Sequence, residues 1–68
     1  MITEAKLAKI VAAFAQYNII LQTDGLMVTR LNQREVSFDA STYMTDQFIK
    51  LITDVLADQI NQDVWGLL

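Results

Sequence analysis

The fold of this protein is decided by residues 19–31, which read IILQTDGLMVTRL. Two apolar, partly β-branched runs flank the dipeptide Asp24-Gly25, and each run is long enough for a strand. An Asp-Gly pair between such runs is the strongest short-range signal for a β-hairpin, because both residues tolerate the positive φ angles of tight turns. The segment therefore predicts two antiparallel strands joined by a short turn.

The spacing of this hairpin predicts which side chains share a face of the sheet. A two-residue turn pairs Thr23 with Leu26 and Leu21 with Val28, and side chains then alternate between the two faces. The face expected to meet the helices carries Ile19, Leu21, Leu26 and Val28. The opposite face is too apolar to stay fully open to water, so we expect a cover over it. It carries Ile20, Gln22, Met27, Thr29 and Leu31.

A third strand is predicted at residues 35–39, where polar and apolar side chains alternate. The preceding turn decides where Val36 and Phe38 point, because a shift of one residue exchanges the two faces of a strand. If Asn32-Gln33 alone forms the turn, both side chains join the outer face. A three-residue loop instead directs them to the core beside Val28, and we favour that loop.

An amphipathic helix is predicted at residues 3–17, ahead of the hairpin. Thr3 can cap its N-terminus, and Asn18 can end it by adopting the left-handed conformation. Its apolar stripe consists of Leu7, Ile10, Val11, Phe14 and Tyr17. Small side chains form a second ridge that would let the other helix approach closely. That ridge consists of Ala5, Ala8, Ala12 and Ala15.

A second helix is predicted after the third strand, from Ser41 or Thr42 to about Gln62, with a hydroxyl side chain as N-cap. Its apolar residues span about half the helix circumference, so we expect it to contact two surfaces. They are Met44, Phe48, Ile49, Leu51, Ile52, Val55, Leu56 and Ile60. Residues 64–68 follow as an apolar tail.

Together these segments predict an α+β fold of order α-β-β-β-α, in which a three-stranded antiparallel meander sheet packs against two helices. Residues 1–68 form one small domain, because no proline, flexible linker or internal repeat marks a boundary. With 53% hydrophobic and 19% charged residues the chain should be ordered. It has no cysteine or histidine, so apolar packing must stabilise it without a disulfide or a zinc ion.

Charge and composition also restrict the partners. A net charge of −3 with five basic residues gives little attraction to nucleic acid or to an anionic membrane. Only two glycines are present, so no glycine-rich loop can hold a phosphate, and we expect no cofactor. We take the cytoplasm as the default compartment.

No arrangement of residues predicts catalysis, and we expect no enzyme and no metal site. Ser37 and Ser41 lack a histidine partner and are explained as strand and cap residues. Asp54 and Asp58 lie one helical turn apart, but a solvated helix face explains them better than a cation site, which needs more converging oxygen ligands.

The apolar surplus points to association with another protein. So much apolar material in so short a chain exceeds what one small core needs, and oligomerisation is a standard remedy. The leading hypothesis is a protein–protein interaction module that forms a homodimer, with a different protein partner also possible. The candidate interface consists of Met44, Phe48, Ile49, Leu56, Ile60, Trp65, Leu67 and Leu68.

Two other functions stay open at this stage. The acidic face with Asp54 and Asp58 is compatible with an inhibitor that binds a basic or nucleic-acid-binding protein. The chain is also compatible with an accessory subunit of an enzyme. Trp65 is a strong candidate anchor, but it could pack against its own sheet or helix instead of a partner.

Overall fold

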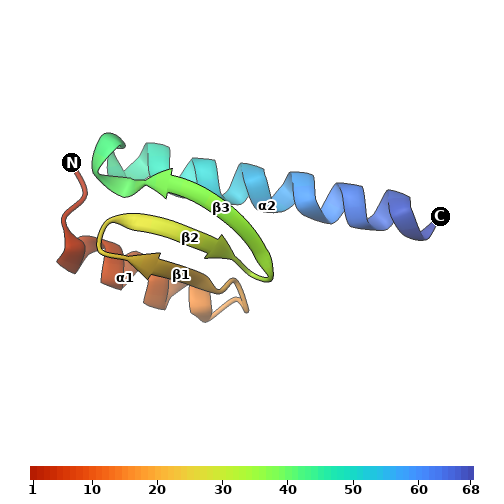
Figure 1. The fold of residues 1–68 in the computed structure, drawn as a ribbon, viewed down its shortest axis with the longest axis horizontal. Helices are drawn as coiled ribbons and strands as arrows, with labels where there is room; N and C mark the ends of the chain where they lie inside the picture. The colour runs from red at the N-terminus through yellow and green to blue at the C-terminus, as the bar shows by residue number, and fades with distance from the viewer.

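The computed structural model describes residues 1–68 and contains a three-stranded antiparallel sheet with two flanking helices (Figure 1). This architecture confirms the predicted α+β class and the α-β-β-β-α order. Both helices lie on one face of the sheet, α1 behind β1 and α2 behind β3 (Figure 1). In chain order the elements are α1 (Glu4–Ala15), β1 (Leu21–Asp24), β2 (Met27–Leu31), β3 (Arg34–Asp39), a 3₁₀ turn η1 (Ala40–Thr42) and α2 (Thr45–Leu67).

The first hairpin turn is shifted by one residue from its predicted place. Asp24 pairs with Met27, so Gly25 and Leu26 are the two central residues. Of these only Gly25 has a positive φ, 61°, which is the pattern of a type II′ turn. The predicted pairing of Thr23 with Leu26 is therefore wrong, although the hairpin itself is confirmed.

A bulge in β2 changes which side chains of the hairpin face the core. Leu21 pairs with Leu31 and Thr23 with Val28, so Thr29 has no partner in β1 and the pairing of Leu21 with Val28 is wrong. The extra residue interrupts the alternation, and Val28 and Leu31 are both fully buried although they are three residues apart. We expected Leu31 on the outer face, and the bulge is the reason that this expectation is wrong.

The turn between β2 and β3 consists of Asn32-Gln33 alone, because Leu31 pairs with Arg34. The favoured three-residue loop is therefore wrong. Val36 and Phe38 nevertheless pack against the core, as we expected. The reason is the bulge: since Leu31 faces the helices, its partner Arg34 does too, and alternation then brings the other two side chains to the same face.

Both ends of α1 are satisfied by local hydrogen bonds. The hydroxyl of Thr3 accepts from the Lys6 N–H at 3.2 Å and caps the N-terminus. At the C-terminus the Asn18 N–H donates to Ala15 O and the Ile19 N–H donates to Phe14 O, the two bonds of a Schellman motif. Asn18 has φ of 60°, so the predicted left-handed residue is confirmed.

The alanine ridge of α1 does not contact α2, contrary to our expectation. Its four members, Ala5, Ala8, Ala12 and Ala15, are all exposed. Instead Leu7 and Ile10 are buried against the sheet, which rotates the ridge away from the second helix.

Helix α2 begins and ends later than predicted. Asp39 Oδ1 accepts from the Ser41 N–H at 3.0 Å and caps the 3₁₀ turn, so neither Ser41 nor Thr42 caps α2. The helix starts at Thr45 and runs for 23 residues to Leu67. The segment predicted as a tail is therefore the last part of the helix.

Nine apolar side chains form the core between the sheet and the helices: Ile2, Leu7, Ile10, Leu21, Val28, Leu31, Ala40, Phe48 and Ile52. Ile19, Leu26, Val36, Phe38, Val55 and Leu56 pack against this core and are partly buried. The outer face of the sheet has no cover within this chain, and Met27 is exposed there. Ile20, also expected on that face, precedes β1 and lines a hollow beside α2.

The length of α2 exceeds what the sheet can cover. A helix of 23 residues is about 35 Å long, whereas the longest strand, six residues, spans about 20 Å. The molecule accordingly measures 41 × 19 × 18 Å. Figure 1 shows the C-terminal part of α2 continuing beyond the β2–β3 turn with no other element beside it.

Candidate interaction surface

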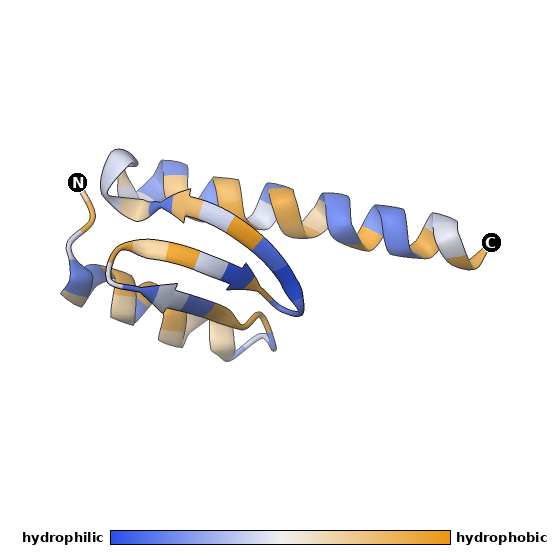
Figure 2. Cartoon of the chain, in the orientation of Figure 1, coloured by the Kyte–Doolittle hydropathy of each residue, from blue (hydrophilic) through white to orange (hydrophobic).

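The distal part of α2, residues 56–67, carries apolar side chains that the rest of the chain covers only at its start, where Leu56 packs against the core. Figure 2 shows hydrophobic bands recurring along α2 to its C-terminal end. At 100° per residue, one row of side chains lies on the flank of α2 that faces α1, about 80° from the buried row around Phe48 and Ile52. We call this row the α2 stripe: Ile49, Leu56, Ile60, Val64 and Leu67.

The α2 stripe is well exposed. Ile49 is 41% exposed, Ile60 54%, Val64 50% and Leu67 88%, while Leu56 is partly buried at the edge of the core. Isolated apolar residues on a surface are ordinary, but a continuous row is typical of an interaction site. Because the apolar residues span about half of the helix circumference, the sequence indicated that α2 contacts a second surface besides the sheet. It did not show which part of α2 the sheet would leave exposed.

A groove lies between the two helices next to this stripe. Its α1 wall carries Ile10, Ala13 and Phe14, followed by Tyr17 and Ile19. Its α2 wall carries Ile49 and Thr53. Lys6 and Lys9 also line it, and the hollow has a volume of about 590 Å³. We call it the inter-helix groove. Sequence reasoning missed it, because it depends on how far apart the sheet holds the helices.

Tyr17 is the most exposed large hydrophobic side chain of this groove, at 75%. It was expected in the buried stripe of α1, but it lies in the turn after the helix and not in the core. Its ring therefore adds apolar area to the surface instead of to the interior.

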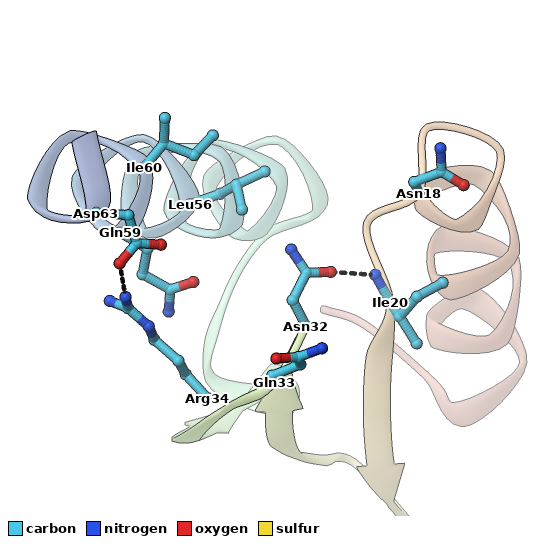
Figure 3. A pocket seen from close by; sticks show the side chains of 9 residues that line it. All are labelled: Asn18, Ile20, Asn32, Gln33, Arg34, Leu56, Gln59, Ile60 and Asp63. Carbon is cyan, nitrogen blue, oxygen red and sulfur yellow. Dashed lines mark hydrogen bonds and ion pairs between the residues drawn. The ribbon is translucent and has the colours of Figure 1, made fainter. Parts of the chain in front are cut away.

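A second, more polar hollow of about 630 Å³ lies where α2 passes the end of the sheet (Figure 3). It is lined by Asn18, Ile20, Asn32, Gln33, Arg34, Leu56, Gln59, Ile60 and Asp63. Three of its polar side chains have partners within the chain. Arg34 forms an ion pair with Asp63, and Asn32 Oδ1 accepts from the Ile20 N–H at 2.9 Å (Figure 3).

The Arg34–Asp63 pair joins β3 to the distal part of α2 across 29 residues of sequence. Arg34 comes to face the helix because the bulge in β2 turns that side of β3 inward. Both side chains are partly exposed, so the pair contributes less than about 1 kcal/mol to stability. It does orient α2 as the helix leaves the sheet. No local sequence signal could have paired these two residues.

The structure distributes the eight predicted interface residues over different parts of α2. Phe48 is fully buried, contacts Tyr43 with ring centroids 6.1 Å apart, and belongs to the core instead of the interface. Met44 is exposed at the N-terminus of the helix, and Leu68 is exposed at the other end. Ile49, Leu56, Ile60 and Leu67 share the α2 stripe.

Trp65 is 70% exposed and does not pack against its own sheet or helix. Its position on α2 is about 140° around the helix axis from Ile60. Trp65 and the α2 stripe therefore belong to opposite sides of the helix, and one flat interface cannot contain both.

The predicted acidic face is partly neutralised. Asp54 Oδ2 accepts a hydrogen bond from Lys50 Nζ at 2.8 Å, one helical turn away. This hydrogen bond and the attraction of the carboxylate raise the pKa of Lys50 above its ordinary value. Asp58 forms no ion pair, so the face presents fewer free carboxylates than the sequence suggested.

The polar side chains considered for chemistry have local structural partners. Ser37 Oγ lies 3.7 Å from Met27 Sδ on the outer face, and Ser41 Oγ donates to Asp39 Oδ1 at 2.6 Å. No three acidic, histidine or cysteine side chains lie close enough together to hold a metal ion. None of the helices has the length and apolar character needed to cross a membrane.

The α2 stripe and the inter-helix groove are thus the two surfaces of the molecule that suggest an interaction. No protein-family model matches the chain, and the searches found neither a curated protein nor a solved structure significantly similar to it.

Proposed function

We propose that this protein is a small interaction module that self-associates through the α2 stripe. The observation that carries the proposal is that α2 continues past the sheet with its apolar row uncovered. Exposed apolar area of this kind is removed from water when two proteins associate, at roughly 25 cal/mol per Å².

The shape of α2 supports association as the use of its distal part. An isolated helix end of about three turns gains little from its own hydrogen bonds in water, and most helical stability comes from packing of an apolar face. The distal part of α2 has such a face, and beyond Leu56 its apolar side chains are exposed. A partner that covers the stripe would stabilise this part of the helix as well.

The spacing of the stripe favours another helix as the contacting element. Ile49, Leu56, Ile60 and Leu67 are separated by seven, four and seven residues, which is the spacing of one seam of a coiled coil. Thr53 and Asp63 occupy the remaining seam positions, so the seam is not uniformly apolar. A second α2 has the same spacing and is therefore a suitable partner.

The test is the change Ile60→Asp, read by light scattering over a dilution series. We expect it to weaken self-association at least about 100-fold, because a carboxylate buried without a partner costs several kcal/mol. Ile60 is half-exposed in the monomer, so circular dichroism should show an unchanged fold.

Two control variants test whether the stripe side of α2 forms the dimer interface. Asn61→Asp adds the same charge at the next, exposed position, off the stripe, and should leave the dimer intact. Trp65→Ala removes a large side chain from the opposite side of α2 and should also leave it intact. A wild-type protein that stays monomeric at the highest concentration would refute the proposal. Loss of the dimer in Trp65→Ala but not in Ile60→Asp would refute the role of the stripe.

A further inference from the structure

We propose that the inter-helix groove of one copy receives the distal part of α2 from a second copy, and that the two copies do this reciprocally in an antiparallel arrangement. This inference rests on the self-association proposed above. It adds a defined receptor surface, the groove, and a defined inserting segment, residues 56–67.

The α2 stripe is continuous with the groove, which makes a reciprocal arrangement possible. Ile49 at the proximal end of the stripe lines the groove, whereas Val64 and Leu67 lie on the distal part beyond it. If two α2 helices cross antiparallel with the two-fold axis near residue 58, Ile49 of each copy lies beside Leu67 of the other. Leu56 then lies beside Ile60 of the other copy. The α2 stripe of each copy thus lines its own groove and also inserts into the groove of the other copy. An isologous interface has this property, because both copies use the same surface.

The distal part of α2 cannot occupy its own groove. It leads away from the sheet in one unbroken helix, with no proline and no interior glycine before Gly66. Reaching the groove within the same chain would require a reversal of direction for which no turn exists. A second copy meets the groove without any change of backbone.

Charge favours this occupant. The groove is bordered by Lys6 and Lys9 on α1, and neither forms an ion pair within the chain. The distal part of α2 carries Asp58 and Asp63 and no basic side chain. Asp63 already pairs with Arg34, and Asp58 lies about 160° around the helix axis from Ile60, so this negative charge favours the approach of the two copies and forms no contact inside the groove.

The area available is of the order that a dimer needs. A large apolar side chain hides on the order of 100 Å² when it is fully buried. Each copy contributes five exposed side chains to the stripe and groove: Tyr17, Ile49, Ile60, Val64 and Leu67. The reciprocal arrangement covers both sets, on the order of 1,000 Å² in total, which is near the lower limit for a specific interface.

The experiment is disulfide trapping, for which the chain is well suited because it has no cysteine of its own. Ala13 is an exposed groove residue on α1, and Val64 lies on the distal stripe. The Ala13→Cys and Val64→Cys variants are mixed and oxidised at a concentration where light scattering shows the wild-type dimer. We expect a mixed disulfide dimer, because insertion would bring Val64 against the groove wall that carries Ala13, and a disulfide needs Cβ atoms about 4 Å apart.

The matched control replaces Ala13→Cys by Ala8→Cys. Ala8 is also an exposed alanine of α1, but it belongs to the ridge that points away from the groove. We expect the mixed dimer with Val64→Cys to form about tenfold less here, since the required Cβ separation is not reached.

The outcomes separate this inference from the proposed function. A wild-type dimer whose Val64→Cys variant links only to itself, or links equally to both alanine variants, overturns insertion into the groove and leaves self-association standing. A strictly monomeric wild-type protein overturns the proposed function and the inference with it.

Discussion

Gly25, Asn18 and Asn32 show how single residues direct the path of this chain. All three have positive φ angles, 61°, 60° and 55°, and each occupies a turn between two elements. Asn32 also joins two strand ends, because its Oδ1 accepts from the Ile20 N–H and its own N–H donates to Ile20 O at 2.7 Å. Residues that tolerate the left-handed conformation thus stand where the structure needs it.

We predict that Gly25→Ala destabilises the protein by about 1 to 2 kcal/mol, because an L side chain is strained at this φ. The added Cβ would meet only Glu4 Oε1 at 3.7 Å, an ordinary contact, so the cost comes from the backbone. Urea unfolding followed by circular dichroism measures the effect.

Gly66→Ala is the matched control for that measurement. Gly66 lies within α2 with nothing near its missing side chain, so the same substitution should be neutral or stabilise by up to about 1 kcal/mol. Equal effects of the two substitutions would contradict the role of φ at Gly25.

At the scale of elements, α2 combines two different surfaces. Its first half buries Phe48 and Ile52 under the sheet, whereas its second half exposes Ile60 and Leu67. No break separates the two halves, because the helix contains no proline and its single glycine stands near the end. One helix therefore contributes both to the core and to the candidate interface.

We predict that alanine substitutions along α2 separate these two roles. Phe48→Ala should cost about 3 to 5 kcal/mol, a large part of the total stability of so small a domain. Ile60→Ala should cost the isolated monomer well under 1 kcal/mol, because its side chain is half-exposed. Urea unfolding at a concentration below the dimer range compares them. Phe48→Leu gives a milder change in the same direction if Phe48→Ala does not fold.

At the scale of the whole molecule, the elongated shape comes from one long helix on a short sheet. A single small sheet supports only part of a helix of 23 residues, and the unsupported part carries apolar side chains. A second copy in the inter-helix groove would give both distal parts a packed environment and cover Tyr17. Folding and association would then be coupled.

We predict that the melting temperature rises with protein concentration. Association with a second folded copy lowers the free energy of the native state by mass action, so a tenfold increase in concentration should raise the melting temperature by several degrees. Differential scanning calorimetry over a dilution series measures this slope. In Ile60→Asp the slope should vanish while the melting temperature of the dilute protein stays unchanged. A wild-type melting temperature independent of concentration would contradict coupled folding and association.

The inward direction of Val36 and Phe38 depends on the bulge, but the sequence alone predicts the α-β-β-β-α order, the hairpin around Gly25 and the caps at Thr3 and Asn18. These features depend on side-chain periodicity and on backbone preferences of neighbouring residues, which act over a few positions. The exposed stripe was only partly predictable: the wide apolar face of α2 was evident, but Phe48 was assigned to the interface and Trp65 to the same surface.

The folded structure was needed to find the bulge at Thr29, the start of α2 at Thr45, the inter-helix groove and the Arg34–Asp63 pair. Apart from the start of α2, which local hydrogen bonds of Asp39 and Gln47 fix, each depends on contacts between segments far apart in the chain. The bulge puts Leu31 into the core and thereby turns Arg34 toward α2, a coupling that no local pattern contains. Which part of α2 is left uncovered depends likewise on where the sheet ends, since burial is a property of the packed whole.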